Sequence, residues 1–187
     1  MANKVLFGFS DLYVGTFEYD SYGDVVMGSP YHQAGAVGFS PEANDDVSHF
    51  RADNINYYTV MGSGAYEGDL EVAMFDDSFK TQFMGFIQLD DGGLAITKNP
   101  SKPNIYMMFA IQGDDAERRV IMYNGKLGSP SRSYSTTDET IEPVTETCNV
   151  TFNGDNETGI VMVTYEKGDT GYSTLFTNPP APELPSA

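Results

Sequence analysis

Few side chains in this 187-residue sequence could perform nucleophilic or metal chemistry. It holds one cysteine, Cys148, and two histidines, His32 and His49. A nucleophilic triad needs a Ser or Cys beside a histidine base and an orienting acid, and neither histidine lies near a Gly-x-Ser-x-Gly turn. One cysteine also excludes an internal disulfide and a multi-cysteine zinc site. We therefore expect no enzyme activity, no cofactor and no metal site, and interpret Cys148 as a buried apolar residue.

Carboxylates are plentiful, with 27 Asp and Glu against 10 Lys and Arg and a net charge of −17. Several lie side by side in turn sequences, such as Asp76-Asp77 and Asp90-Asp91. A glycosidase needs two carboxyl groups about 5–10 Å apart in a cleft, which adjacency in a turn does not predict. The segment 153–157 resembles part of a calcium loop but lacks the Asp-x-Asp-x-Asp-Gly run. We interpret these acids as solvated turn residues, and the net charge disfavours binding to nucleic-acid phosphates or an anionic membrane.

The commonest local pattern is the two-residue alternation of a half-buried β-strand. It is clearest in Leu70–Met74 and Cys148–Phe152, where the even positions are apolar. Asn104–Ile111 and Gly159–Tyr165 are apolar on both faces and are predicted to be central strands, or strands that other parts of the protein cover on both sides. Clusters of Gly, Asn and Asp between these segments predict turns. Further strands are expected at Lys4–Val14, Thr16–Tyr19, Ala34–Phe39, Ile55–Met61, Phe86–Leu89, Leu94–Lys98 and Arg118–Tyr123.

One segment has helical rather than strand spacing. Phe75, Phe79 and Phe83 recur every four residues, which places three rings on one side of a short helix that ends at Gly85. We expect this helix to pack against a sheet, and a weaker helical turn over Thr170–Phe176. The whole pattern predicts a mainly β protein, an antiparallel β-sandwich or barrel-like fold with one short packing helix.

Two segments depart from regular structure. Residues 39–54 have a poor apolar pattern and are expected to form a projecting loop or an extended hairpin. Residues 178–187 contain four prolines and are expected to form an extended arm, which divides the chain into a β domain over 1–177 and an arm over 178–187. No segment has the pattern of a signal peptide or of a membrane-spanning helix, so we expect a protein made in the cytoplasm.

Eight stretches of the sequence, taken together, carry a resemblance to known proteins. They are Ser29–Asn44, Tyr66–Phe75, Phe79–Phe83, Asp90–Gly93, Lys102–Tyr106, Arg118–Tyr123, Ile141–Glu146 and Thr174–Pro180. They resemble the major tail protein family of bacteriophages with long non-contractile tails. The similarity runs in order over nearly the whole chain and is weakest between about 124 and 140.

This resemblance implies a tail tube protein with no catalytic residues. Such a structural virion protein would assemble with copies of itself, in the host cytoplasm, into stacked hexameric rings that form the hollow tail tube. Its other partners would be a tape measure protein and the tail completion, terminator and distal tail proteins, with no membrane partner. DNA would pass through the lumen as non-specific cargo, and acidic walls would keep its phosphates from sticking. The acidity could equally keep free subunits soluble.

The candidate contacts between subunits lie in the two irregular segments and close to them. An alternative function is a non-catalytic carbohydrate-binding or adhesive β-sandwich, since aromatic-rich acidic sandwiches can bind sugars, although this chain has no Trp. The predicted contact residues are Pro41, Asn44, Asp46, Phe50, Tyr57, Tyr58, Phe176, Pro179, Pro180 and Leu184.

Overall fold

The computed structural model describes residues 8–44, 47–52, 55–61, 64–113, 115–133 and 144–185, with the backbone alone for 47–52 and 55–61. The described chain is mainly antiparallel β, as the alternation predicted, with one short helix. The elements in chain order are β1 (Phe9–Tyr19), β2 (Val25–Met27), β3 (Tyr31–Gln33), β4 (Ala36–Asn44), β5 (Val47–Ala52), β6 (Ile55–Met61), β7 (Ala65–Val72), α1 (Asp77–Phe83), β8 (Phe86–Gln88), β9 (Leu94–Ile96), β10 (Ile105–Ile111), β11 (Arg119–Leu127), β12 (Ser131–Arg132), β13 (Glu146–Phe152) and β14 (Met162–Tyr165).

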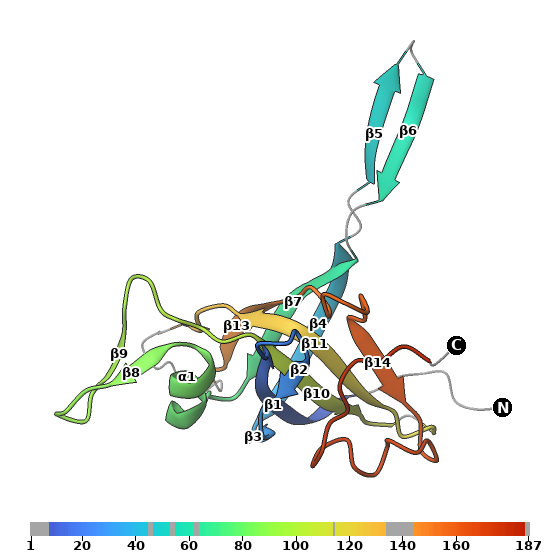
Figure 1. The fold of residues 1–187 in the computed structure, drawn as a ribbon. Helices are drawn as coiled ribbons and strands as arrows, with labels where there is room; N and C mark the ends of the chain where they lie inside the picture. Colours follow the sequence, from blue (N-terminus) through green and yellow to red (C-terminus); the bar gives the residue numbers. More distant parts are fainter. Residues whose placement is uncertain are drawn as a thin grey trace, which may run out of the picture.

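One large sheet forms the body of the molecule (Figure 1). Its hydrogen-bonded path runs β2-β1-β10-β11-β13-β7-β4, while β3, β14 and β12 pair with β1, β11 and β13. The sheet curls so that β4 approaches β1, and the rings of Phe39 and Phe9 lie 6.3 Å apart. Because the sheet curls, its two halves enclose an apolar interior between them. The fold is therefore sandwich-like, although a single large sheet forms it.

The central strands β10 and β11 are buried on both faces, as the continuous apolar run over 104–111 predicted. Met107 and Met122 face the interior of the curl, where they join α1, β7 and β13. Tyr106 and Tyr123 point to the other face, which the segment around Leu175 covers. Each strand therefore carries two apolar clusters, and removing either cover would expose apolar surface.

Helix α1 forms where the phenylalanine spacing predicted it. Phe75, Phe79 and Phe83 are all buried, with ring centroids 5.2 and 5.0 Å apart along the stripe. Asp76 precedes the helix, although its side chain makes no capping hydrogen bond. Gly85 has a φ of +73°, a left-handed conformation that suits glycine at the end of a helix.

The predicted irregular segment over 39–54 is regular β-structure where it is described. Strand β4 continues to Asn44, and β5 follows within the same segment. Strands β5 and β6 pair with each other in a two-stranded sheet of their own that projects away from the large sheet (Figure 1). The extended-hairpin alternative is therefore confirmed and the loop alternative is wrong, because cross-strand pairing does not require clean apolar alternation.

Two strand predictions need correction. The expected break between two strands near Gly15 does not occur: β1 runs through it, and Gly15 leaves room for the Tyr106 ring, which a Cβ would strike. The segment 159–165 is neither central nor covered on both sides: β14 pairs with the first half of β11 at an edge, and Met162 is 41% exposed. An all-apolar run does not by itself place a strand inside a sheet.

The predicted turn over 170–176 is a series of hydrogen-bonded turns, with the amide of Tyr172 donating to the carbonyl of Asp169. The described residues include no helix with the length and apolar character needed to span a bilayer.

Candidate functional site

The candidate catalytic side chains that the structure describes, those of His32 and Cys148, have structural surroundings. His32 is exposed on β3, and its ring lies 4.8 Å from that of Tyr13. Cys148 is buried on the inner face of β13, and burial raises the pKa of its thiol to about 12. A thiol held protonated in this way is a poor nucleophile. The interpretation of Cys148 as a buried apolar residue is confirmed, while the side chain of His49 lies outside the described structure.

Of the acidic pairs that are described, Asp76-Asp77 lies at the start of α1 and Asp90-Asp91 lies in a turn. Asp77 is in the first turn of α1, and Asp91 accepts a hydrogen bond from the amide of Gly93 at 3.0 Å in the β8–β9 turn. Over the described ranges, no three His, Cys, Asp or Glu side chains are grouped closely enough to hold a metal ion.

The segment that resembled a calcium loop contains a buried carboxylate with a structural role. Asp155 is 4% exposed and accepts hydrogen bonds from the hydroxyl of Tyr19 at 2.9 Å and from the amide and hydroxyl of Thr158 at 2.8 and 2.7 Å. Burial alone would raise the pKa of Asp155, but these hydrogen bonds outweigh it and lower the pKa below its usual value. The carboxylate ties the loop after β13 to the end of β1.

A second buried acid, Glu146, holds α1 against the sheet. Its carboxylate accepts a hydrogen bond from the amide of Phe75 at 2.6 Å and forms ion pairs with Lys80 at 3.2 Å and Arg132 at 2.8 Å. Sequence reasoning missed this cluster. The signal was available, because Glu146 has the same strand parity as the inward-facing Cys148.

The predicted contact residues fall into two groups. Pro41 and Asn44 lie on β4, close to the base of the projecting hairpin. Phe50 belongs to β5, and Tyr57 and Tyr58 belong to β6; their side chains are outside the description. Asp46 lies outside the described residues altogether. The described members of the first group therefore lie on β4, which with β7 forms the ribbon β4–β7, and on the β5–β6 hairpin that follows β4 in the chain.

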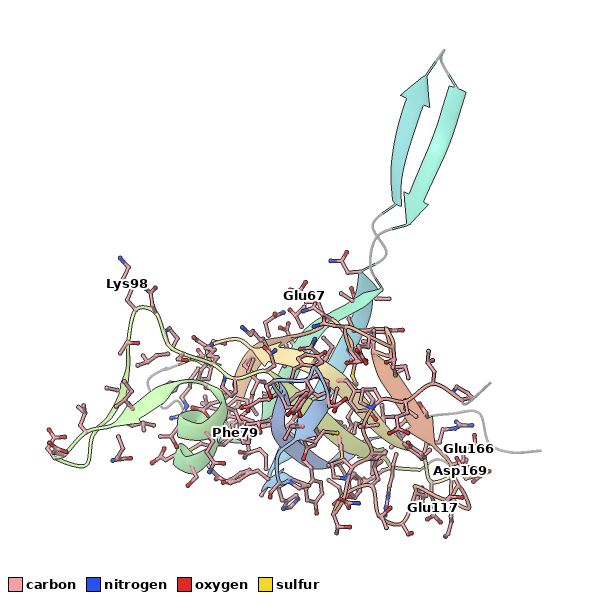
Figure 2. All side chains as sticks on the ribbon, viewed as in Figure 1. Glu67, Phe79, Lys98, Glu117, Glu166 and Asp169 are labelled. Atoms are coloured by element: carbon pink, nitrogen blue, oxygen red, sulfur yellow. The ribbon has the colours of Figure 1, made fainter. Side chains whose placement is uncertain are left out.

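A shallow concavity of about 220 Å³ marks the base of this ribbon. It is lined by Glu42, Ala43, Asn44 and Glu67, and Glu67 is labelled there in Figure 2.

The C-terminal group lies on a different part of the molecule. Phe176 stacks on Tyr13 with a centroid separation of 4.8 Å, and the guanidinium of Arg119 lies 4.5 Å from its ring. The carbonyl of Pro180, after Pro179, accepts a hydrogen bond from Tyr123 at 3.1 Å. In the isolated chain the first part of the predicted arm is therefore docked on its own sheet.

Beyond these contacts, the side chain of Leu184 is 62% exposed. The roles of Phe176, Pro179, Pro180 and Leu184 between subunits stay predictions.

Acidic residues also gather at the end of the molecule opposite α1, where Figure 2 labels Glu117, Glu166 and Asp169. Two of the three pair with bases: Lys167 contacts Glu117 at 2.6 Å, and Arg118 contacts Glu166 at 3.0 Å. These exposed pairs shape the loops rather than form a ligand site.

The β8–β9 hairpin is a surface feature that sequence reasoning did not single out. Ile87, Leu89 and Ile96 are each about half exposed, at 51%, 46% and 46%. Phe86 and Leu94 line an open groove of about 520 Å³, which reaches Lys80 and Glu146. The signal in the sequence was apolar side chains at consecutive positions, which no half-buried strand can cover on both faces.

Comparison with known proteins gives structural neighbours and no family. No protein-family model and no curated protein matches the chain. The tube-terminating cap of the anti-feeding prophage has a TM-score of 0.46 at 13% identity, over 88% of this chain and 95% of that one. A chain of the sheath–tube complex of the PVC extracellular contractile injection system has a TM-score of 0.46 at 10% identity, over 83% and 88%. A chain of the sheath/tube terminator of the same system has a TM-score of 0.45 at 10% identity, over 87% and 98%.

Proposed function

We propose that this chain is a structural subunit of a phage-like tail, which associates with copies of itself into stacked hexameric rings that form a hollow tube. The observation that carries the proposal is the ribbon β4–β7, which extends past the curled sheet into a separate two-stranded hairpin (Figure 1). The sequence resemblance to the major tail proteins supports the same function. The role is structural and not enzymatic.

The free edge of β4 supports pairing between copies. Among the described strands, β4 forms its ladder with β7 alone, from Ala36 to Asn44. An edge of this length offers backbone donors and acceptors to another chain, and proteins cover such edges or limit them. Pro41 lies on this last strand of the path, where a missing N–H is tolerated. Closing a ring of copies would cover the edge.

The β5–β6 hairpin supports contact beyond a single ring. A two-stranded sheet in water is marginally stable by itself and gains stability when a further surface covers it. The segment 47–61 is rich in apolar and aromatic residues, including Phe50, Tyr57 and Tyr58. We therefore assign the hairpin to the contact with a neighbouring copy.

The net charge of −17 per subunit fits a conduit for DNA. A wall that repels phosphates lets DNA slide without sticking, and only charges within about 8 Å of the DNA act at physiological salt. The partners of such a tube are a tape measure protein within it and completion, terminator and distal tail proteins at its ends. We place the protein in the virion tail, after assembly in the host cytoplasm.

Negative-stain electron microscopy of the concentrated purified protein tests the proposal. We expect rings or tubes from the wild-type chain, and loss of tubes when residues 47–61 are replaced by a short Gly-Ser linker. Unchanged far-ultraviolet circular dichroism of the body would show that the variant still folds. A protein that stays monomeric at every concentration and binds glycans on an array would instead support the carbohydrate-binding alternative.

The C-terminal arm can be tested separately. Because Tyr123 bonds to the carbonyl of Pro180, deleting 178–187 removes contacts of the subunit itself as well as any contact between copies. Deleting 183–187 leaves those contacts in place. Shorter or fewer tubes after the shorter deletion would support the arm as a contact between rings, and unchanged tube length and yield would contradict it.

A further inference from the structure

We propose that the β8–β9 hairpin is the surface on which the β5–β6 hairpin of a second copy docks. This inference rests on the proposed function, because it names the receiving surface for the contact assigned above to β5–β6.

The β8–β9 hairpin is the most apolar exposed element next to α1. Ile87 and Leu89 have their side chains on one face of the hairpin, and Ile96, which pairs with Phe86, has its side chain on the opposite face; each of the three is about half exposed. Two neighbouring strands alone bury little of these side chains. Exposed apolar side chains gathered on one element mark an interaction surface, whereas scattered ones do not.

The tip of this hairpin is fixed by several hydrogen bonds. The amide of Leu89 donates to the carbonyl of Gly93 at 2.8 Å, and the side-chain amide of Gln88 donates to the carbonyl of Gly92 at 2.8 Å. The carboxylate of Asp91 accepts from the amide of Gly93. The apolar side chains are therefore presented on a preformed hairpin, which lowers the entropic cost of docking.

The two hairpins leave the body on different sides (Figure 1). β5–β6 continues the ribbon β4–β7, while β8–β9 follows α1 at the far side of the curled sheet. They lie too far apart to cover each other within one chain. A contact between them must join different copies, and such a head-to-tail contact produces rings or open filaments rather than closed two-fold dimers.

Charge favours this pairing over others. The subunit carries −17, but segment 47–61 is formally neutral, and segments 86–89 and 92–97 have no charged residue. Two acidic copies approach with least repulsion through such elements. Arg51, at the bulge of β5, is the only Lys or Arg between Lys4 and Lys80 in the sequence, and Asp90 lies at the tip of β8–β9. Arg51 and Asp90 are therefore one oppositely charged pair that would set the register of the contact.

The apolar part of the contact is tested with exposed residues, so that folding is preserved. In the full chain, the triple variant Ile87→Ser, Leu89→Ser and Ile96→Ser should raise the protein concentration needed for assembly at least about tenfold. Val26→Ser is the matched control, because Val26 is 49% exposed on β2. Light scattering against concentration measures both. An equal assembly threshold for the triple variant and the control would overturn the proposal.

The charged part is tested by reversal and mixing. Arg51→Glu and Asp90→Lys should each weaken assembly about tenfold, because each brings like charges together. Asp90 is chosen over Asp91, which holds the turn. A one-to-one mixture of the two variants should assemble almost as well as the wild type, since every contact then joins opposite charges. A mixture that assembles no better than either variant would overturn the proposal.

Failure of this inference and failure of the proposed function give different results. Wild-type tubes together with unaffected β8–β9 variants would overturn only the docking surface. A wild-type protein that never assembles would overturn both.

Discussion

Helix α1 and the β8–β9 hairpin are neighbours in the sequence, and both are rich in apolar residues, yet they have opposite environments. Phe79 of α1 is fully buried, with rings of Phe75, Phe83 and Tyr31 within 6 Å. Ile87 of β8, eight positions later, is 51% exposed. The difference lies in what covers each element: α1 closes the interior of the curled sheet, and β8–β9 extends past it (Figure 1).

Two buried polar side chains also hold helix α1 against the sheet. Gln33 is buried and bonds to the backbone just before α1, with its amide donating to the carbonyl of Met74 at 3.1 Å. Glu146 accepts a hydrogen bond from the amide of Phe75 and forms an ion pair with Lys80. The β8–β9 hairpin has hydrogen bonds that fix its own turn. The comparison teaches that α1 is packed into the interior of the subunit, whereas β8–β9 keeps apolar side chains exposed.

The largest effect is expected at the centre of the phenylalanine stripe. Phe79→Ala should lower the free energy of unfolding by about 3–5 kcal/mol, because it removes a buried ring and leaves a cavity. Urea denaturation of the unassembled subunit measures it. A loss below about 0.5 kcal/mol would show that α1 does not close the interior.

The ion pairs of Glu146, which hold α1, should contribute somewhat less to the free energy of unfolding than the Phe79 ring. Glu146→Gln leaves Lys80 and Arg132 without their shared carboxylate, so we expect a loss of about 2–3 kcal/mol. Glu67→Gln, an exposed acid on β7, is the control and should change stability by less than about 0.5 kcal/mol. Equal effects of the two substitutions would contradict the anchoring role.

Asp155 anchors a loop in the same way, and its effect should depend on pH. Because its folded-state pKa is lowered, its stabilisation is complete above about pH 4, the value for an unfolded chain, and is lost as pH falls through the folded-state pKa. Asp155→Asn should cost about 1–2 kcal/mol at pH 7. Denaturation at several pH values should show this difference shrinking in acid, and a constant difference would count against the assignment.

The smallest effect is expected in the exposed hairpin. Ile87→Ala should change the stability of the unassembled subunit by less than about 0.5 kcal/mol, in contrast to Phe79→Ala. Thermal unfolding below the assembly concentration measures it. A loss comparable to that of Phe79→Ala would remove the distinction between the two regions.

Much of the local structure could be predicted from the sequence. The four-residue phenylalanine spacing located α1, and the continuous apolar run over 104–111 identified a central strand. The prediction for 159–165 failed because the same kind of run can occupy an edge when its partner strand is long enough for two neighbours. β11 pairs with β14 over Arg119–Met122 and with β13 over Gly125–Leu127.

The functional surface was only partly predictable. Pro41 and Asn44 lie on β4, and Phe50, Tyr57 and Tyr58 lie on the separate β5–β6 hairpin that follows it in the chain. The exposed side chains of β8–β9 and the Glu146 cluster were missed. Parity could place Glu146 on the inner face of β13, but its partner Lys80 is 66 positions away in the sequence. The consecutive apolar residues of β8–β9 do not by themselves show that the sheet leaves them uncovered.

The sequence by itself determined the periodicities, the turns and the acidic charge, because these depend on residues within a few positions of one another. Only the tertiary structure decided which apolar segments are covered. Burial is a property of pairs of elements: Phe79 and Ile87 are both large apolar residues, and the curl of the sheet encloses one and leaves the other exposed.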